Sequence, residues 1–355
     1  MKGIVLHGGL GTRLRPLTYS GPKQLIQVAN KPISQYVIED LIESGIRDIA
    51  IVLGNTFPEI VMDYYGDGSR FGARFEYIFQ EKPLGIAHAV SLCEEFVGND
   101  KFVVYLGDNI LQYGIKKYVS KFIERDLDSM ILLKEVEDPR SFGVAKFSVD
   151  GKLVGLVEKP KDPPSKYAVI GVYMFKPIVF QAIKKLKPSW RGEYEITDTI
   201  QMLIDWGLKV GYEIIEGWWF DTGKKDDILT VNSIILDERI KDKKILGNIE
   251  ESRIEGRVEI GENARIVSSH IRGPAIIGRD AEIINSYVGP YTSIGRGVKI
   301  IDSGVEYSII MDESHIEGIN IINESLIGRK TIIRKSKSGL PFVKLSLSDH
   351  SYIEL

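Results

Sequence analysis

Short apolar runs recur along the first two-thirds of the chain. They are Lys2–Leu6, Ile49–Leu53, Phe75–Phe79, Phe102–Leu106 and Met130–Leu133. Between the first two runs, apolar residues at helical spacing occupy Pro32–Gly45, with a proline near the start and a glycine at the end. Short buried strands separated by helices predict βαβ units and an α/β fold with a Rossmann-like mixed, mostly parallel sheet.

From about residue 246 the spacing of apolar residues changes to a 17-residue repeat with internal steps of 5, 6 and 6. The repeating positions are Ser252, Ser269, Ser286 and Ser303; Ile254, Ile271, Val288 and Val305; Ile260, Ile277 and Ile294; and Ile266, Ile283 and Ile300. After one irregular turn the pattern resumes at Ile316, Ile321, Ile327 and Ile333. This repeat is typical of a hexapeptide-type parallel β-helix with three short flat sides. A β-sandwich would instead give strict alternation and hairpin turns.

The change of pattern divides the chain. We expect an α/β domain over residues 1–236, a linker over 237–245, a β-helix domain over 246–340 and a tail over 341–355. The charged stretch Asp237–Lys244 suits the join.

Composition narrows the class of protein. Hydrophobic residues make up 43% of the chain, charged residues 27%, and the net charge is −3, so no basic surface argues for a nucleic acid or an anionic membrane. Cys93 is the single cysteine, which fits a reducing compartment. No segment approaches the length of a membrane span, and the first residues do not form a signal peptide. We therefore expect a soluble, cytoplasmic protein.

The stretch GGLGTRLRPLT at residues 8–18 follows the first predicted strand and suggests a phosphate-binding loop. It lacks the Gly-Lys-Ser/Thr of a Walker loop, and Leu14 stands where a dinucleotide fingerprint needs glycine. Arg13 and Lys23 accompany the glycines. Two cations beside a glycine turn suit a triphosphate whose pyrophosphate end must be stabilised as it leaves.

A second polar turn, Gly107-Asp108-Asn109, follows the predicted strand Phe102–Leu106. Ligands of parallel α/β sheets bind outside the carboxyl ends of the strands. We therefore expect this turn and the glycine loop to lie at the same edge of the sheet.

Seven further motifs follow the opening loop in order. They are QEKPLGIAHA (80–89), YLGDN (105–109), FGVAKF (142–147), VEKPK (157–161), GVYMF (171–175), RGEYEITD (191–198) and WWFDTG (218–223). With GGLGTRLRPLT and PKQL, this set resembles the sugar-1-phosphate nucleotidylyltransferases, and most closely the long form of the glucose-1-phosphate thymidylyltransferases. The resemblance covers nearly the whole chain and implies that the β-helix is left-handed.

The resemblance implies an activity. Members of that family join a sugar 1-phosphate to a nucleoside triphosphate, giving a nucleotide sugar and pyrophosphate. The expected substrates are glucose 1-phosphate and either dTTP or UTP, and the sequence leaves the choice of nucleotide open. Because the sugar phosphate is already an anion, the reaction needs positioning and charge stabilisation rather than a general base.

The resemblance also implies which residues carry the chemistry. Asp108 and Asp221 match carboxylates that bind Mg²⁺, which favours one or two carboxylates plus phosphate oxygens. Arg13 and Lys23 would hold the triphosphate, and Lys159 would grip the sugar phosphate. The other expected contacts are Gly8, Gly9, Gly11, Gln24, Gln80 and Gly85 with the nucleotide, and Gly143, Glu158, Tyr173 and Arg191 with the sugar phosphate.

Two alternative functions stay open. Related proteins with a β-helix can also transfer an acetyl group to glucosamine 1-phosphate, and His270, His315 or His350 could act as a base. Some translation-initiation exchange-factor subunits use this layout as a non-catalytic scaffold. Arg13, Lys23 and the acidic pair argue against the scaffold. The resemblance implies that the β-helix serves assembly, and we expect a homo-oligomer.

Overall fold

The computed structural model describes residues 1–336. Within them the chain forms two compact units, each of which is described here by itself. The first unit comprises Met1–Leu10, Gly21–Leu25 and Ile33–Asp221. The second comprises Gly11–Ser20, Ile26–Pro32 and the chain from Thr222 onward. The domain boundaries expected from the sequence stay predictions, and the expected tail at 341–355, together with His350, lies outside the described residues.

The first unit is built on a mixed sheet of nine strands, all within the described residues. The strands are β1 (Lys2–His7), β4 (Asp48–Leu53), β5 (Arg74–Phe79), β6 (Phe102–Leu106), β8 (Ser129–Glu135), β9 (Gly143–Phe147), β10 (Leu153–Glu158), β11 (Tyr167–Phe175) and β12 (Val210–Ile214). Their order is β10-β9-β11-β6-β1-β4-β5, and β8 pairs with β11 and β12. Neighbours β6, β1, β4 and β5 are parallel, whereas β11 runs antiparallel to β6. The sheet is thus Rossmann-like and mixed, as predicted.

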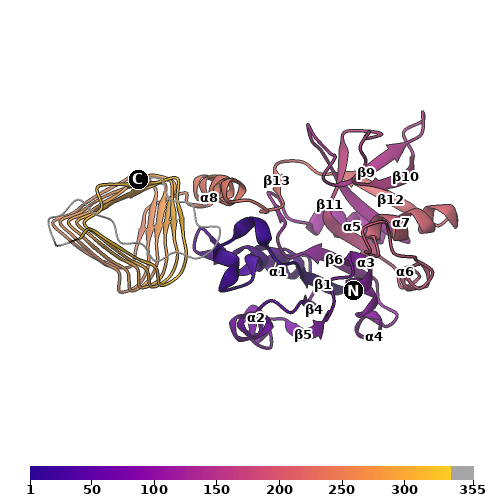
Figure 1. The fold of residues 1–355 in the computed structure, drawn as a ribbon, viewed down its shortest axis with the longest axis horizontal. Helices are drawn as coiled ribbons and strands as arrows, with labels where there is room; N and C mark the ends of the chain where they lie inside the picture. Colours follow the sequence, from indigo (N-terminus) through magenta and orange to yellow (C-terminus); the bar gives the residue numbers. More distant parts are fainter. Residues whose placement is uncertain (337–355) are drawn as a thin grey trace. The chain divides into compact units, whose positions relative to one another are not determined.

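Helices cover both faces of this sheet (Figure 1). They are α1 (Ile33–Glu43), α2 (Pro58–Tyr65), α3 (Ile86–Ser91), α4 (Glu94–Val97), α5 (Lys116–Glu124), α6 (Val179–Ile183) and α7 (Ile196–Asp205). Along β6, Phe102 and Val104 enter one core, and Val103 and Tyr105 enter the other. This alternation on two buried faces explains why the predicted strands read as continuous apolar runs.

A small ribbon lies apart from the main sheet. Strand β7 (Ile110–Leu111) pairs antiparallel with β13 (Trp219–Phe220), with Phe220 opposite Ile110 and Trp219 opposite Leu111. The ribbon joins segments more than a hundred residues apart in the sequence, directly beside the Gly107-Asp108-Asn109 turn.

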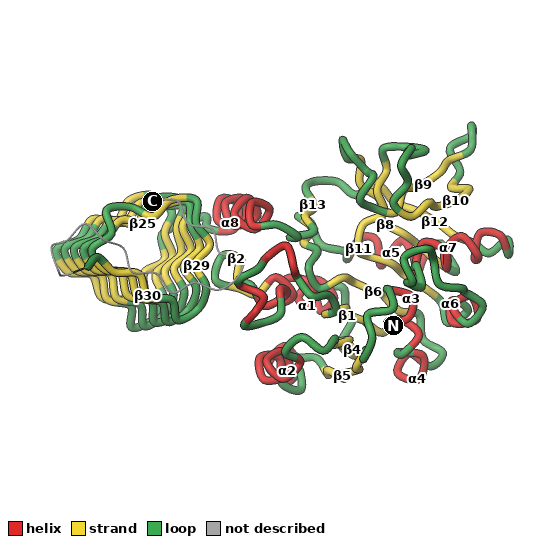
Figure 2. Tube along the Cα trace, viewed as in Figure 1, coloured by secondary structure: helices red, strands yellow, loops and turns green. Residues whose placement is uncertain are grey.

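The second unit contains a left-handed parallel β-helix with three sheets (Figure 1). One sheet holds β14 (Lys244–Ile245), β17 (Val258–Ile260), β20 (Ala275–Ile277), β23 (Thr292–Ile294), β26 (Ile309–Ile310) and β29 (Leu326–Ile327). The next holds β15 (Asn248–Glu250), β18 (Arg265–Val267), β21 (Glu282–Ile284), β24 (Lys299–Ile301), β27 (His315–Glu317) and β30 (Ile332–Arg334). The third holds β16 (Arg253–Glu255), β19 (His270–Arg272), β22 (Tyr287–Val288), β25 (Gly304–Glu306) and β28 (Ile322–Asn323). Figure 2 shows strands alternating with short turns in every coil.

The 17-residue repeat has a direct structural cause. Ile271, Val288 and Val305 point into the interior of the helix, each stacked on the equivalent residue of the next coil. The repeated serines form a ladder, in which the hydroxyl of Ser269 accepts from the backbone N–H of Ser286 at 3.0 Å.

One position in the predicted β-helix register is wrong. Ile321 is 51% exposed, and Ile322 takes the inward place opposite Val305. The reason is the irregular turn, in which the step between coils shortens from 17 to 16 residues along two of the three sides. A register extended through that turn therefore slips by one position.

The second unit also contains α8 (Lys225–Arg239) and the short hairpin of β2 (Gln27–Val28) and β3 (Lys31–Pro32). Among residues 1–336, no helix combines the length and apolarity needed to cross a membrane.

Candidate active site

A cavity of about 420 Å³ opens in the first unit at the carboxyl ends of β1 and β6. Residues predicted from the sequence supply many of its walls: Gly9, Lys23, Asp108, Gly143, Glu158, Lys159, Tyr173, Arg191 and Asp221. The structure adds lining residues that were not predicted as site residues: Ile86, Leu106, Asn109, Ser141, Phe142, Val169, Gly171, Glu193, Glu195, Ile196, Thr197 and Trp219. The expected clustering at one sheet edge is thus present.

The β7–β13 ribbon brings Asp108 and Asp221 to this cavity. Asp108 precedes β7 by two residues, and Asp221 directly follows β13. Because Phe220 lies opposite Ile110 in the antiparallel register, the chain continues from each strand end into the same region. Both carboxylates line the cavity.

Asn109 connects the two halves of the ribbon. Its side-chain oxygen accepts hydrogen bonds from the indole N–H of Trp219 at 2.7 Å and from the backbone N–H of Gly171 at 3.2 Å. Its amide nitrogen donates to Oδ1 of Asp108 at 2.8 Å. Asn109 is only 2% exposed, and its side-chain oxygen accepts two hydrogen bonds while its nitrogen donates one, so this amide holds one carboxylate and one aromatic side chain in place.

Lys23 forms an ion pair with Oδ2 of Asp108. The lysine lies on the short 3₁₀ turn Lys23–Leu25, and both side chains are mostly shielded from solvent. A partly buried pair of this kind is screened weakly by salt. The pair places a cation and a potential metal ligand at the same wall of the cavity.

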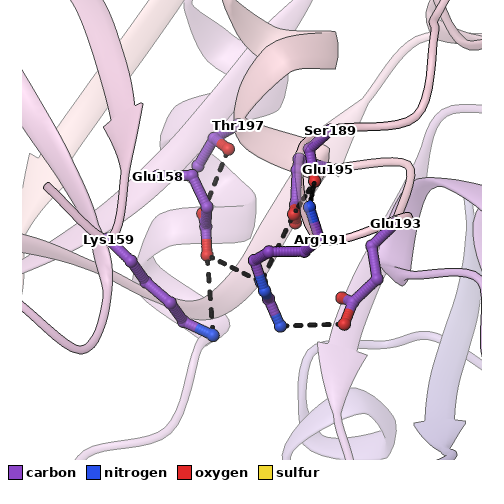
Figure 3. Close-up of polar contacts among 7 residues, drawn as sticks. All are labelled: Glu158, Lys159, Ser189, Arg191, Glu193, Glu195 and Thr197. Atoms are coloured by element: carbon purple, nitrogen blue, oxygen red, sulfur yellow. Dashed lines mark hydrogen bonds and ion pairs between the residues drawn. The ribbon is translucent and has the colours of Figure 1, made fainter.

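A second part of the cavity wall carries a cluster of acidic and basic side chains (Figure 3). Thr197 donates its hydroxyl to Oε2 of Glu158 at 3.1 Å. Oε1 of the same carboxylate lies 3.6 Å from Nη1 of Arg191 and 3.9 Å from Nζ of Lys159. The two cations thus share one carboxylate oxygen at distances loose enough to leave N–H donors for an anionic ligand.

Arg191 is fixed by its own loop. Its Nη2 donates to Glu193 at 2.8 Å and its Nη1 to Glu195 at 3.3 Å. Ser189 donates to the same Oε1 of Glu195 at 2.8 Å and accepts from the backbone N–H of Arg191 at 3.2 Å. The motif RGEYEITD contained a signal for Glu193 and Glu195, since these two glutamates follow the predicted Arg191 at short spacing.

Burial and the carboxylate of Glu195 raise the pKa of Glu158, although Lys159 and Arg191 act in the opposite direction. Burial, together with the charge of Glu158, also raises the pKa of Tyr173. Tyr173 therefore keeps its phenolic proton at neutral pH and can donate a hydrogen bond into the cavity.

Gly143 is required by the shape of this wall. A Cβ atom at this position would lie 2.6 Å from the methyl carbon of Thr197 and 3.3 Å from Oε2 of Glu158. Any larger residue would therefore push into the Thr197–Glu158 hydrogen bond.

The predicted nucleotide residues Gln24, Gln80, Gly8 and Gly85 form a second group in the first unit. Nε2 of Gln24 donates to the carbonyl of Gly8 at 2.9 Å, and Nε2 of Gln80 donates to the carbonyl of Gly85 at 3.1 Å. Gly8 faces Gln80, since a Cβ there would lie 3.6 Å from its amide oxygen. Gly85 adopts φ +101°, which favours glycine.

His7, at the end of β1, is buried, and neither ring nitrogen has a hydrogen-bond partner within residues 1–336. Burial lowers its pKa to about 3, so the imidazole is neutral. The amide oxygen of Gln24 is likewise buried and unpartnered in that range. Both side chains lie beside Gly107, since a Cβ atom there would lie 3.2 Å from Cδ2 of His7 and 3.4 Å from Cγ of Gln24.

Gly11 and Arg13 belong to the second compact unit. The guanidinium of Arg13 packs against Gly223, where a Cβ would lie 2.5 Å from Nη2. The structure does not bring these two residues into the set that lines the cavity, and their role stays a prediction.

The fold and this site together define a class of enzyme, and comparison with known proteins agrees. The sequence model of the family described as nucleotidyl transferase matches residues 2–238. The chain belongs to this family, and it is a nucleotidyltransferase.

Particular relatives extend over the whole chain. A glucose-1-phosphate thymidylyltransferase of Streptomyces antibioticus is 45% identical over 100% of this chain and 99% of its own length. A low-salt glycan biosynthesis nucleotidyltransferase of Haloferax volcanii is 46% identical over 96% of both chains. A Bacillus anthracis protein provisionally named glucose-1-phosphate thymidylyltransferase, solved with sucrose, superimposes with a TM-score of 0.63 at 41% identity, over 69% of this chain and 98% of its own.

Proposed function

We propose that this protein is a glucose-1-phosphate thymidylyltransferase. It transfers the nucleoside monophosphate of dTTP to glucose 1-phosphate, in a reaction that depends on Mg²⁺, and releases pyrophosphate. The relatives that extend over the full chain and carry this activity in their names support the substrates.

One observation carries the proposal. A single cavity is lined by Asp108, Asp221 and Lys23 and also by Glu158, Lys159 and Arg191. Transfer between two phosphorylated substrates needs two anion-binding regions at reacting distance, with catalysis mainly by positioning and charge stabilisation. The group of Asp108, Asp221 and Lys23 suits a triphosphate, and the group of Glu158, Lys159 and Arg191 suits a sugar phosphate.

The residues fit a magnesium ion. Asp108 and Asp221 offer hard carboxylate oxygens, and no larger group of histidine, cysteine, aspartate or glutamate that could hold a metal occurs among residues 1–336. Two carboxylates suit Mg²⁺, which takes its remaining ligands from phosphates and water, better than a metal that needs an all-protein site. When bound, the ion would neutralise charge on the phosphates.

The protein's own groups then have distinct tasks. Lys23 neutralises Asp108 and supplies N–H donors to the triphosphate. Lys159 and Arg191 hold the sugar phosphate so that its oxygen faces the α-phosphate, and Glu158 accepts from the sugar hydroxyls. Arg13 would stabilise the charge that develops on the departing pyrophosphate.

For the base, the amides of Gln24 and Gln80 offer donors and acceptors that match the imide edge of a pyrimidine. The amide oxygen of Gln24 has no partner within residues 1–336, and a base imide N–H is the kind of donor it lacks. Thymine and uracil share this edge, so UTP is the closest competitor of dTTP.

The proposal is tested by a matrix of nucleoside triphosphates against sugar 1-phosphates, read by pyrophosphate release with and without Mg²⁺. We expect the highest kcat/KM with dTTP and glucose 1-phosphate. A clear preference for UTP would replace the nucleotide in the proposal, and no release with any pair would reject it.

A further inference from the structure

The phosphate-binding segment is divided between the two compact units. Lys23 and its short 3₁₀ turn belong to the first unit, but the segments on both sides, 11–20 and 26–32, belong to the unit that contains the β-helix. The two segments on either side of the Lys23 turn thus pack with the β-helix domain, which is far from them in the sequence.

The hairpin at 26–32 is fastened to α8 and the β-helix by hydrogen bonds that are buried or partly buried. The amide oxygen of Asn232, on α8, accepts from the backbone N–H of Ala29 at 2.9 Å and from the hydroxyl of Ser293 at 2.6 Å. Its amide nitrogen donates to the carbonyl of Tyr291 at 3.0 Å. Asn30 adds a hydrogen bond to the carbonyl of Ile294 at 2.7 Å.

Asn232 is 1% exposed and Ser293 is fully buried. A buried amide with all of these partners satisfied fixes geometry, because any displacement would leave polar groups unpaired. Asn232 therefore links α8, on which it lies, to both the hairpin and the β-helix.

The segment at 11–20 meets the same unit in two places. Leu17 contacts Gly328 on the last described coils, where a Cβ would lie 3.0 Å from its methyl carbon. The guanidinium of Arg13 packs against Gly223, two residues before the start of α8. The helix that carries Asn232 thus begins two residues after the glycine against which Arg13 packs.

We propose that the β-helix is a positioning scaffold for the triphosphate-binding loop, and that Asn232 is the positioning residue that fastens it. The effect that we expect on nucleotide kinetics rests on the proposed function. The effect that we expect on the mobility of residues 11–20 and 26–32 does not. It assigns the β-helix a task within each chain, in addition to any part in assembly.

The structural consequence is tested by hydrogen exchange on the full-length protein. Asn232→Ala is expected to speed amide exchange in residues 11–20 and 26–32 while leaving residues 143–158 of the sugar-phosphate wall unchanged. Exchange in 11–20 and 26–32 identical to that of the wild type would overturn the proposal. This readout does not depend on any activity.

The kinetic consequence is measured by pyrophosphate release. We expect Asn232→Ala to lower kcat/KM for the nucleotide by about twofold to thirtyfold, with the KM for glucose 1-phosphate unchanged. In an Arg13→Ala background the same substitution should add little, because both changes act through one loop. Equal losses for both substrates, or full additivity with Arg13→Ala, would overturn the proposal.

Alanine substitutions of two serines provide a matched control. They also keep the proposal testable if Asn232→Ala does not fold. Ser293→Ala removes one hydrogen bond to Asn232, whereas Ser286→Ala removes hydrogen bonds made only within the β-helix. We expect a nucleotide-specific loss for Ser293→Ala and none for Ser286→Ala. Indistinguishable kinetics and exchange for the two would contradict the scaffold. If the wild type releases no pyrophosphate with any substrates, the proposed function fails and exchange alone decides the scaffold.

Discussion

Trp219 donates its indole N–H to the side-chain oxygen of Asn109 at 2.7 Å. Asn109 in turn donates to Asp108 at 2.8 Å, and Asp221 follows Trp219 by two residues. One buried amide therefore links the two turns that carry the acidic pair. The ring of Trp219 also packs edge-on against Phe142, with ring centroids 5.3 Å apart, so the bond and the aromatic contact hold the same wall.

Trp219→Phe tests this link. The variant retains an aromatic ring against Phe142 but leaves the oxygen of Asn109 with one bond fewer. We expect the Mg²⁺ concentration for half-maximal pyrophosphate release to rise, and the stability to fall by about 1 kcal/mol. Trp218→Phe, on the neighbouring residue, is the control and should leave the Mg²⁺ dependence unchanged. Equal effects of the two variants would contradict a specific role for the Trp219–Asn109 bond.

Gly143→Ala tests the shape of the sugar-phosphate wall. The new methyl group would overlap the methyl carbon of Thr197, which lies 2.6 Å from the required position. Overpacking of this kind costs about 1–3 kcal/mol, and here it would disturb the hydrogen bond to Glu158. We expect a higher KM for glucose 1-phosphate and an unchanged KM for dTTP.

Thr197→Ser offers a rescue of that variant, because it removes the clashing methyl group and keeps the hydroxyl that binds Glu158. The double variant Gly143→Ala/Thr197→Ser should therefore recover most of the lost affinity. A double variant as weak as Gly143→Ala alone would show that the clash is not the cause.

Glu158→Gln should separate stability from function. Burial and Glu195 raise the pKa of Glu158 above its value in the unfolded chain, so its ionised form destabilises the folded state. That cost is fully present above the folded pKa, decreases as the pH falls through it, and vanishes below the unfolded pKa. We expect the variant to melt at a higher temperature than the wild type at pH 7, with a difference that shrinks on acidification.

The same variant should bind glucose 1-phosphate more weakly, because a neutral amide accepts hydrogen bonds from sugar hydroxyls less strongly than a carboxylate. The measurements are melting curves across the acidic range and the KM for glucose 1-phosphate at pH 7. A variant that is less stable than the wild type at pH 7 would contradict the proposed cost of the buried charge.

The periodic parts of the fold could be predicted from the sequence. The apolar runs at Lys2–Leu6 and Phe102–Leu106 became β1 and β6 with almost the predicted bounds, because strands buried on both faces leave a continuous apolar signal. The β-helix followed from its repeat for the same reason. Ile321 was misplaced because a repeat carries no information about a coil of different length.

Part of the candidate site could not be predicted from the motifs. Asp108 and Asp221 are far apart in sequence, and only the pairing of Phe220 with Ile110 shows how they reach one cavity. Asn109 acts through Asp108 and Trp219, so its importance depends on three-dimensional contacts that sequence spacing does not encode. The motifs likewise did not show that Gly11 and Arg13 belong to the compact unit of the β-helix, because this depends on packing between segments that are far apart in the sequence.

The central claim is that Asp108 and Asp221 together hold Mg²⁺ against the phosphates of the nucleotide. The most direct measurement is pyrophosphate release from dTTP and glucose 1-phosphate over a Mg²⁺ titration, for the wild type, Asp108→Asn, Asp221→Asn and the surface control Asp100→Asn. We predict that release requires Mg²⁺ and that each site variant loses several kcal/mol of transition-state stabilisation, while the control is unaffected. Near-normal turnover of either site variant at the Mg²⁺ concentration that saturates the wild type would contradict the account.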